Sequence, residues 1–338
     1  MDHFLGIDVG SVTTKLVVVG DDEQPIYALY ERTNGRPVAA IQRALGMLSA
    51  AGMSLNIRGV GATGSGRQLA AVMLGADEVR TEITAHAMAA KCACPTVSTI
   101  IDIGGQDSKV IILKRGVFTA FNMNTVCAAG TGSFLDHQAT RLGIAIEDFG
   151  DYALRSTAPV KIAGRCGVFA ESDLIHKQQM GYTPEDLIAG LCMSLARNFL
   201  QNVARDAEGR KMFPAVLFQG GVAANVGMRA AFETLLGQEL VIPRYFKEMG
   251  AWGAALLAKR RIHHSHEPTS FRGIDHIANF ACHPRSFNCP HCSNNCEISE
   301  LYIDDHLMSR WGSRCAKWDN LRLSSAELVE ERETAIRK

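Results

Sequence analysis

The sequence has no net charge, because 35 Lys and Arg residues balance 35 Asp and Glu residues. Such a chain does not attract a nucleic-acid backbone or an anionic membrane over its whole surface. It also lacks a long apolar run: the longest stretch without charge, 116–135, contains Asn, Thr, Ser and Gly and could not span a bilayer. No export signal stands at the N-terminus, where Asp8 follows only a few apolar residues. We therefore expect a cytoplasmic protein without a nucleic-acid or membrane partner.

Aromatic residues are few, at 7%, and proline occurs only 10 times, whereas 47% of the residues are hydrophobic and 21% are charged. This composition excludes a disordered chain and is typical of a globular protein of about two domains. The 10 cysteines do not indicate a disulfide framework, because a chain of this length can bury a core of its own. Half of them lie in the body of the chain and half lie after residue 281. This distribution indicates two separate roles.

Apolar runs of strand length alternate with helical patterns along most of the chain. The first two predicted strands form a hairpin around Gly10 and Ser11, and a similar order returns later. Residues 260–268 are rich in His and Arg and predict a linker, and Ser324 begins a short charged helix. The predicted strands are 4–8, 15–19, 27–31, 55–61, 117–123 and 215–219, and the predicted helices are 37–51, 82–91, 132–142, 183–206 and 250–259.

One segment of the chain occurs twice. The residues from Ile7 to Val17 align without gaps to those from Ile101 to Ile111. In each copy an apolar strand ends in Asp, a glycine turn follows, and a Lys opens the next strand. Such an internal repeat predicts two similar α/β subdomains that face one another. The predicted domains are 1–95 (completed by a helix at 250–262), 96–249, and a linker with a Cys-rich module at 263–338.

The two glycine turns are candidate phosphate sites, because a residue without a Cβ lets backbone N–H groups approach phosphate oxygens. The Asp before each turn can hold Mg²⁺ through water, since Mg²⁺ keeps several waters and needs only one or two carboxylates. Lys15 or a threonine hydroxyl can reach the terminal phosphates. The repeat therefore predicts that phosphate and Mg²⁺ are bound at Asp8, Gly10, Ser11 and Lys15 in one copy and at Asp102, Gly104 and Gly105 in the other.

A third glycine turn joins a predicted strand to a helix at Gly220, Gly221 and Asn225, where a flat nucleoside could lie against the backbone. With the small residues at 250–255, the three turns resemble the superfamily of actin, sugar kinases and the heat-shock chaperone ATPases. That resemblance implies two duplicated subdomains that clamp ATP. The segment 59–64 fits the dinucleotide pattern Gly-x-Gly-x-x-Gly, but the repeat already accounts for a nucleotide, and no P-loop sequence is present.

Cys127 and Cys166 each stand in a glycine-containing turn before a predicted helix. A helix N-terminus stabilises a thiolate through its dipole and its free N–H groups, which suits an iron–sulfur ligand. The other interpretation is that each is a small buried hydrophobe, the usual state of a free cysteine. A [4Fe–4S] cluster needs four thiolates, so a two-fold homodimer would complete the set from two cysteines.

The segments 102–107, 126–132 and 164–166 together resemble the BadF/BadG/BcrA/BcrD-type ATPases, which activate 2-hydroxyacyl-CoA dehydratases, and their reductase relatives. The resemblance covers about residues 4–260. It implies one [4Fe–4S] cluster between the subunits of a homodimer, with Cys127 and Cys166 as ligands. It also implies that ATP or ADP is bound with Mg²⁺, and that the residues around the phosphates are Asp8, Ser11, Thr13, Lys15, Asp102, Gly104, Gly105 and Gln106. It further implies that ferredoxin or flavodoxin donates an electron to the cluster. The protein then uses ATP hydrolysis to pass the electron to a partner, which is a dehydratase-like protein, a reductase or a double-cubane-cluster protein.

By analogy with other nucleotidases, Gln106 is a candidate to orient the water that attacks ATP, beside Asp8 and Asp102 as catalytic residues. The segment 81–87 also looks like part of this family. We assign its Glu82 and His86 to a structural helix rather than to chemistry.

The tail carries Cys289, Cys292, Cys296 and Cys315 in the spacing Cys-x₂-Cys-x₃-Cys-x₁₈-Cys. Short spacing closes a chelate loop, and a distant fourth ligand folds the tail over the metal. Four thiolates suit Zn²⁺ and iron–sulfur alike, so the spacing predicts a metal site that folds as its own module, without fixing the metal. The short activators of the family end near residue 260, before this tail. No role is assigned to Cys92, Cys94, Cys282 or the histidines between 263 and 266.

Two other functions are open at this point. A small-molecule kinase of the same superfamily would need a catalytic carboxylate in an acceptor pocket and would need no cluster. An ATP-sensing adaptor would switch through its body and bind partners through a metal-stabilised tail. An iron–sulfur absorption band in protein prepared without oxygen would separate the electron carrier from both.

Overall fold

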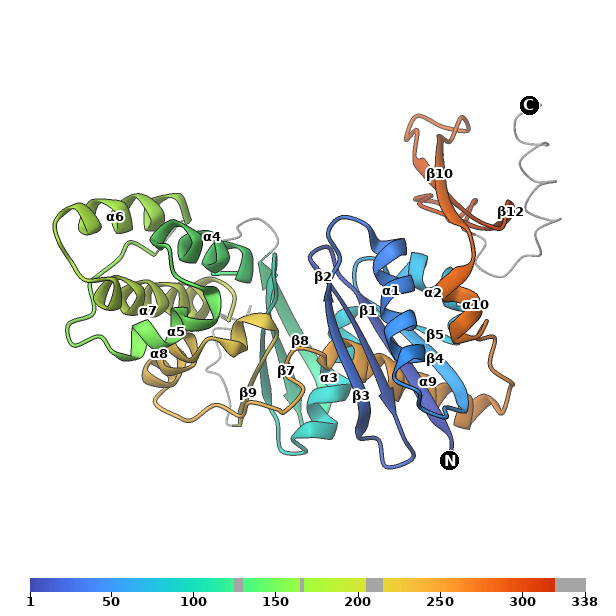
Figure 1. The fold of residues 1–338 in the computed structure, drawn as a ribbon, viewed down its shortest axis with the longest axis horizontal. Helices are drawn as coiled ribbons and strands as arrows, with labels where there is room; N and C mark the ends of the chain where they lie inside the picture. The colour runs from blue at the N-terminus through green and yellow to red at the C-terminus, as the bar shows by residue number, and fades with distance from the viewer. Residues whose placement is uncertain (125–129, 165–166, 205–214, 320–338) are drawn as a thin grey trace. The chain divides into compact units, whose positions relative to one another are not determined.

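The computed structural model describes residues 1–124, 130–164, 167–204 and 215–319 (Figure 1). The chain forms two compact units. Unit 1 combines residues 1–85 with the residues from 250 onward, and unit 2 is the continuous stretch 86–249. The first boundary differs from the predicted 95, because the helix that carries residue 85 begins in unit 1 and continues into unit 2. Among the helices of the described residues, none combines the length and the apolarity needed to cross a lipid bilayer.

The sheet of unit 1 has five strands in the order β3-β2-β1-β4-β5. The central strand β1 is buried along its whole length, pairs antiparallel with β2 and pairs parallel with β4. This matches its almost continuous apolar sequence, which is typical of a strand covered on both faces. The strands are β1 (His3–Val9), β2 (Thr13–Val19), β3 (Pro25–Arg32), β4 (Ile57–Thr63) and β5 (Glu78–Val79).

Three helices belong wholly or largely to this unit: α1 (Pro37–Ala50), α2 (Arg67–Leu74) and α9 (Met249–Ser265), while α3 (Glu82–Ala93) begins in it. Helix α1 starts with Pro37, whose fixed φ suits the first turn. Helix α9 lies against the sheet without a layer of side chains between them. A Cβ on Gly6 of β1 would be 1.9 Å from the Ala251 carbonyl oxygen, and one on Gly61 of β4 would be 2.0 Å from that of Ala254. Gly59 and Gly61 of the 59–64 motif therefore serve strand–helix packing.

The sheet of unit 2 has four strands in the order β8-β7-β6-β9. As in unit 1, an antiparallel hairpin, here β6 and β7, has a parallel strand beside it, here β9. Its helices cover the sheet and share one hydrophobic core with it, in which Phe218 and Phe199 both pack edge-on against Phe232. The strands are β6 (Thr99–Ile103), β7 (Ser108–Lys114), β8 (Val117–Asn124) and β9 (Val216–Gln219). The helices are α4 (Gly132–Leu142), α5 (Ile146–Leu154), α6 (Gly167–Gln179), α7 (Pro184–Asn202), η1 (Gly221–Ala224) and α8 (Val226–Leu236).

The described part of the tail is α10 (Ile274–Asn279) and an antiparallel sheet of β10 (Cys282–Asn288), β11 (Glu297–Ile303) and β12 (His306–Trp311). Two predictions about it differ from the structure. The predicted linker at 260–268 is largely the end of helix α9. The predicted separate module shares the core of unit 1: Ile277, Phe280, Leu301 and Ile303 pack with Ile41, Leu45 and Met73 of α1 and α2. The apolar faces of α10 and β11 have their partners in unit 1, so they do not need a core of their own.

Candidate functional site

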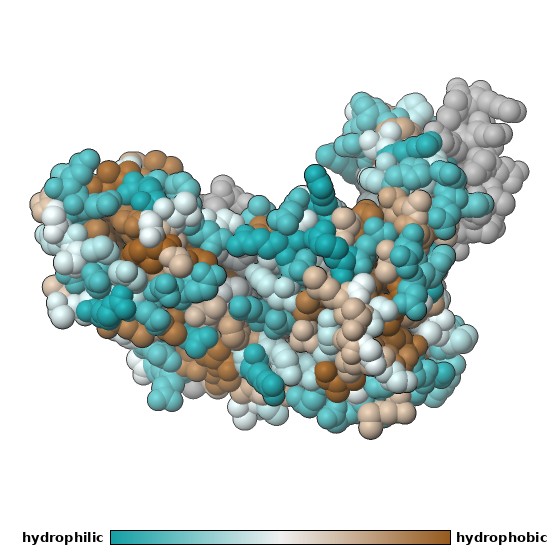
Figure 2. All heavy atoms as spheres, viewed as in Figure 1, coloured by the Kyte–Doolittle hydropathy of each residue, from teal (hydrophilic) through white to brown (hydrophobic). Residues whose placement is uncertain are grey.

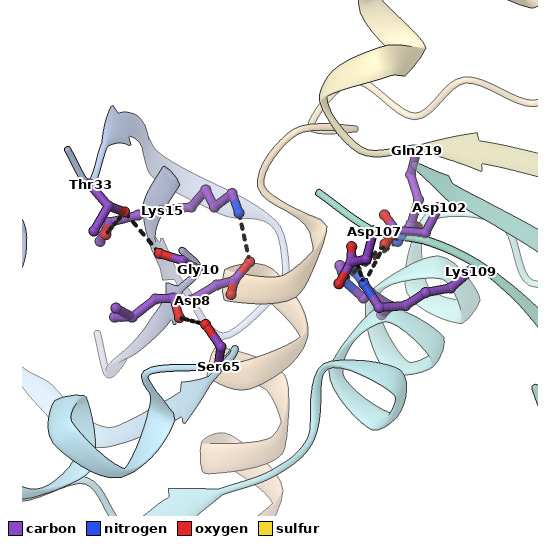
Figure 3. Close-up of polar contacts among 12 residues, drawn as sticks. Asp8, Gly10, Lys15, Thr33, Ser65, Asp102, Asp107, Lys109 and Gln219 are labelled. Carbon is purple, nitrogen blue, oxygen red and sulfur yellow. Dashed lines mark hydrogen bonds and ion pairs between the residues drawn. The ribbon is translucent and has the colours of Figure 1, made fainter. Parts of the chain in front are cut away.

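The first hairpin of unit 1 places a carboxylate and an ammonium group together at the end of β1. The turn is closed by the Gly10 N–H, which donates to the Thr13 carbonyl at 2.9 Å. Asp8 and Lys15 face each other in the strand register, and Lys15 Nζ lies 3.1 Å from Asp8 Oδ2 (Figure 3). Thr33 Oγ1 donates to the Gly10 carbonyl at 2.9 Å, which fixes the turn to the end of β3. Of the other predicted residues, Ser11 is exposed and Thr13 is buried.

Two glycines keep the space beside the Asp8 carboxylate clear. A Cβ on Gly64 would lie 2.5 Å from Asp8 Oδ1, and Gly64 has a positive φ of 91°. A Cβ on Gly250, in the first turn of α9, would lie 2.6 Å from Asp8 Oδ2. Neither glycine was predicted to be a site residue, although both stand in glycine-containing motifs of the sequence. Only residues without a Cβ fit this close to the carboxylate.

The second hairpin, in unit 2, repeats the first in detail. The Gly104 N–H donates to the Asp107 carbonyl at 2.9 Å, and Asp102 faces Lys109 in the register. Lys109 Nζ lies 3.4 Å from Asp102 Oδ2 and 2.8 Å from Asp107 Oδ1 (Figure 3). The strand–turn–strand arrangement that the internal repeat predicted is thus present in both units, and the structure adds an Asp–Lys ion pair in each that the sequence reasoning did not predict. The predicted Gln106 is exposed in this turn.

Asp102 also belongs to a buried polar network that its counterpart Asp8 lacks among the described contacts. Gln219 Nε2, at the end of β9, lies 3.4 Å from Asp102 Oδ1 and 2.7 Å from His86 Nδ1. His86 Nε2 lies 3.5 Å from Asp102 Oδ2. Because an amide nitrogen only donates, His86 Nδ1 accepts its hydrogen bond, and Nε2 is the ring nitrogen that faces Asp102. His86 therefore contacts a site carboxylate, in addition to its expected place in helix α3.

The other end of the Gln219 amide is its side-chain oxygen, Oε1. Its Oε1 is buried without a hydrogen bond among the described residues. A buried acceptor of this kind is normally paired with protein, water or ligand. The residues at the end of β9 therefore fit a site that takes up water or a polar ligand next to Asp102. The spacing along the chain gave no signal for Gln219, because the contact depends on the parallel pairing of β6 with β9.

We expect Gln219→Leu to lower the free energy of unfolding by about 1–3 kcal/mol, because Asp102 and His86 would lose a buried hydrogen-bond donor. Urea titration of the variant and the parent measures this difference. Gln179→Leu, at an exposed position of α6, should change the value by less than about 0.5 kcal/mol. Equal stability of the Gln219→Leu variant and the parent would show that the network does not stabilise unit 2.

The third glycine turn follows Gln219 directly. Gly220 has a φ of 87°, and a Cβ there would lie 2.4 Å from the Ile103 carbonyl oxygen, so glycine is required where β9 passes the end of β6. Gly221 begins the short helix η1. Asn225 has a structural role, because its Oδ1 caps α8 by accepting from the Met228 N–H at 3.0 Å. Its buried Nδ2 has no partner among the described residues.

Comparison with known proteins identifies the family. Residues 5–258 match the model of the BadF/BadG/BcrA/BcrD ATPase family. The chain belongs to this family. It is 37% identical over 265 residues to the (R)-2-hydroxyglutaryl-CoA dehydratase activating ATPase of Acidaminococcus fermentans, an alignment that covers 77% of this chain and 98% of the relative. It is 29% identical to a subunit of the benzoyl-CoA reductase of Thauera aromatica, over 82% of this chain and 98% of the relative.

A solved structure of the family has the same mixed α/β, actin-like ATPase fold. The activator of the 2-hydroxyisocaproyl-CoA dehydratase from Clostridium difficile, solved with bound ADPNP, superposes with a TM-score of 0.71 at 33% identity. The match covers 78% of this chain and 97% of that structure. The family match ends at residue 258, so the tail sheet lies outside it. The family match and the nucleotide analogue bound in that relative support nucleotide binding, without testing which residues bind it here.

Two of the predicted metal ligands of this ATPase, Cys127 and Cys166, lie outside the described residues. The remaining cysteines differ widely in their surroundings. Burial raises the pKa of the Cys192 thiol to about 12, and burial together with Asp304 raises that of Cys282 to about 11. The pKa of Cys289 is lowered, first by a hydrogen bond from the His291 backbone and then by one from Trp318. Within the described ranges, no three His, Cys, Asp or Glu side chains are grouped as a metal site.

Proposed function

We propose that this ATPase activates a partner enzyme by electron transfer. Two copies would hold one [4Fe–4S] cluster through Cys127 and Cys166 and pass a low-potential electron to a protein of the 2-hydroxyacyl-CoA dehydratase, benzoyl-CoA reductase or double-cubane-cluster type. The names of the relatives support the partner class, because they include dehydratase activators and a component of a reductase. Ferredoxin or flavodoxin would donate the electron. A [4Fe–4S] cluster, when bound, supplies the one-electron chemistry.

The observation that carries this proposal links the second hairpin turn to helix α4. The backbone N–H groups of Gly132 and Ser133, at the start of α4, donate to the carbonyls of Gly104 and Gly105 at 2.8 and 2.9 Å. Cys127 precedes this helix by only a few residues. A movement of the turn on nucleotide binding would therefore be transmitted to the start of α4, close in sequence to Cys127.

Helices α4 and α6, which follow Cys127 and Cys166 in the sequence, pack in the same direction (Figure 1). His137 of α4 lies 3.9 Å from Glu171 of α6, and farther along both helices Arg141 donates to Gln178 at 3.2 Å. Their N-terminal ends therefore lie at the same end of the pair. This arrangement supports a common ligand for the two cysteines, since each precedes one of these ends.

The surface at the start of α6 supports a second copy. Val168 and Phe169 are 70% and 65% exposed, and Figure 2 shows apolar side chains on the surface of this part of unit 2. Large exposed apolar side chains that gather in a patch are typical of protein contacts. Because two cysteines per chain cannot complete a four-thiolate set, a homodimer that covers this surface would supply the other two.

The hairpin residues have the groups that ATP hydrolysis requires. In the proposed function Asp8 and Asp102 hold Mg²⁺ through water, the N–H groups of the glycine turns bind phosphate, and Lys15 and Lys109 balance the phosphate charge. Gln106, exposed in its turn, would orient the attacking water. Gln219, which donates to Asp102, and His86, which lies beside it, would hold the Asp102 carboxylate in its orientation toward the turn.

The proposal is tested by mixing the reduced protein, prepared without oxygen, with a 2-hydroxyacyl-CoA dehydratase component. We expect the partner to be reduced when Mg²⁺ and ATP are present, and the amount of reduced partner to be at least about tenfold lower with ADP. Two readouts measure this: the loss of the reduced cluster signal of the activator in electron paramagnetic resonance, and the gain of dehydratase activity. Omission of the partner is the control. Transfer of the ATP phosphate to a small molecule, with no cluster signal, would instead indicate a kinase.

A further inference from the structure

The tail hairpin brings two cysteines together through its backbone. Strands β10 and β11 are antiparallel, and their pairing ends with Asn288 opposite Glu297. The next pair continues the ladder, because the Cys289 N–H donates to the Cys296 carbonyl at 2.8 Å. Cys292 lies at the tip of the turn that these two residues close. Three cysteines thus occupy one short hairpin turn.

The fourth cysteine lies in a loop that packs on this turn. Ser313 Oγ donates to Asp319 Oδ1 at 2.9 Å and accepts from the Trp318 N–H at 3.1 Å, so the loop that contains Cys315 is closed. The Trp318 indole Nε1 donates to Cys289 Sγ at 3.2 Å, and the Trp318 ring packs edge-on against Phe287 of β10. The two cysteine-bearing segments are therefore held together by Trp318.

Hydrogen bonds to the sulfur of Cys289 match what a metal thiolate needs. The sulfur accepts from the His291 backbone N–H, two residues later in the same Cys-x₂-Cys turn, and from Trp318. Donors of this kind stabilise a metal-bound thiolate and orient it. Cys282, in the same sheet, is half-buried and lies near the carboxylate of Asp304. These surroundings disfavour a thiolate, which makes Cys282 a matched control.

A buried cation lies over the Trp318 ring. Arg310 is fully buried, donates from Nε to Glu300 Oε1 at 2.9 Å, and stacks over the Trp318 ring with Cζ 5.4 Å from its centre. Its Nη1 and Nη2 have no hydrogen-bond partner among the described residues. A divalent ion with four thiolates carries a net negative charge, and a buried guanidinium nearby would offset part of it.

We propose that Cys289, Cys292, Cys296 and Cys315 bind one thiophilic metal ion in a tetrahedral site. In the described structure these four side chains are not grouped as a metal set. Cys292 and Cys315 are both exposed, so their thiols would turn toward the buried Cys289 when the ion binds. Four thiolates at this spacing suit Zn²⁺ or iron, and metal analysis distinguishes the two. This inference does not depend on the proposed electron transfer.

The test uses the full-length chain with Cys127→Ala and Cys166→Ala, so that the body cluster does not contribute metal. We expect close to one Zn or Fe per chain without acid-labile sulfide, and a thiolate-to-metal charge-transfer band after exchange with Co²⁺. Cys292→Ser and Cys315→Ser should each weaken Co²⁺ binding by at least about tenfold, whereas Cys282→Ser should not change it.

Three results would overturn the proposal: no bound metal in the parent, equal Co²⁺ affinity in the Cys292→Ser and Cys315→Ser variants and the parent, or a disulfide among the four cysteines in protein kept reduced. Acid-labile sulfide in the parent would replace the single ion with a cluster and also contradict it. Because the body cysteines are absent in every sample, these outcomes leave the proposed function untouched.

Discussion

Replacing either Asp8 or Asp102 with Asn is expected to lower the rate of ATP hydrolysis by at least about 100-fold, because each change removes a charge proposed to hold Mg²⁺ and the phosphate region in place. Asn has nearly the shape of Asp, so the hairpin backbone should persist. The phosphate released per minute at saturating Mg²⁺ and ATP measures the loss. If a variant needs a higher Mg²⁺ concentration than the parent for half-maximal hydrolysis, the replaced carboxylate acts by binding Mg²⁺.

Asp275→Asn is the control for these two variants, since Asp275 is an exposed residue at the start of α10 that contacts Ser49. Its hydrolysis rate should equal that of the parent. Each test variant removes one Asp–Lys ion pair, so circular dichroism must show that the variants are folded. If folded variants hydrolyse ATP at the parental rate, the two hairpins do not form a phosphate site.

The second large effect concerns iron. Cys127→Ala and, separately, Cys166→Ala should each remove the body cluster, because a [4Fe–4S] cluster that loses two of its four ligands in a dimer is not retained. Iron and acid-labile sulfide per dimer, measured in protein prepared without oxygen, should fall by one cluster equivalent. Nucleotide binding should remain, since both cysteines lie outside the hairpin turns.

Cys192→Ala provides the matched control. Cys192 is buried in α7, and burial raises the pKa of its thiol to about 12, so it is a poor ligand. This variant should keep its iron. Unchanged iron in both the Cys127→Ala and the Cys166→Ala variants would exclude a cluster shared between two copies.

The hairpins could be predicted from the sequence because their information is local. An Asp at the end of an apolar strand, a glycine turn and a Lys seven residues after the Asp fix the Asp–Lys pair once the turn forms. The start of α7 could be predicted for the same reason, because its N-cap is also a local signal. The Thr183 side-chain oxygen accepts a hydrogen bond from the Asp186 N–H, as an N-cap residue does. The bounds of most predicted elements agree with the structure for this reason.

Contacts between distant segments could not be read in this way. Gln219 meets Asp102 only because β9 pairs with β6, and Gly250 meets Asp8 only because α9 returns to the N-terminal sheet. The prediction of an independent tail was wrong for the same reason. The cysteine spacing predicts a metal module, but the apolar residues of α10 and β11 complete the core of unit 1. Their spacing along the chain does not show which partner they cover.

Unit 1 is built from two segments at opposite ends of the chain, which affects how the protein folds during its synthesis on the ribosome. The N-terminal hairpin and helices α1 and α2 leave the ribosome first, but α9, which packs directly on the sheet, and the segment from α10 to β11 follow only after the whole of unit 2. Unit 2 is continuous and can acquire its core as soon as it has emerged. The nascent chain is therefore expected to complete its middle before its beginning, with the apolar β1–β2 hairpin exposed to chaperones until the last strands arrive.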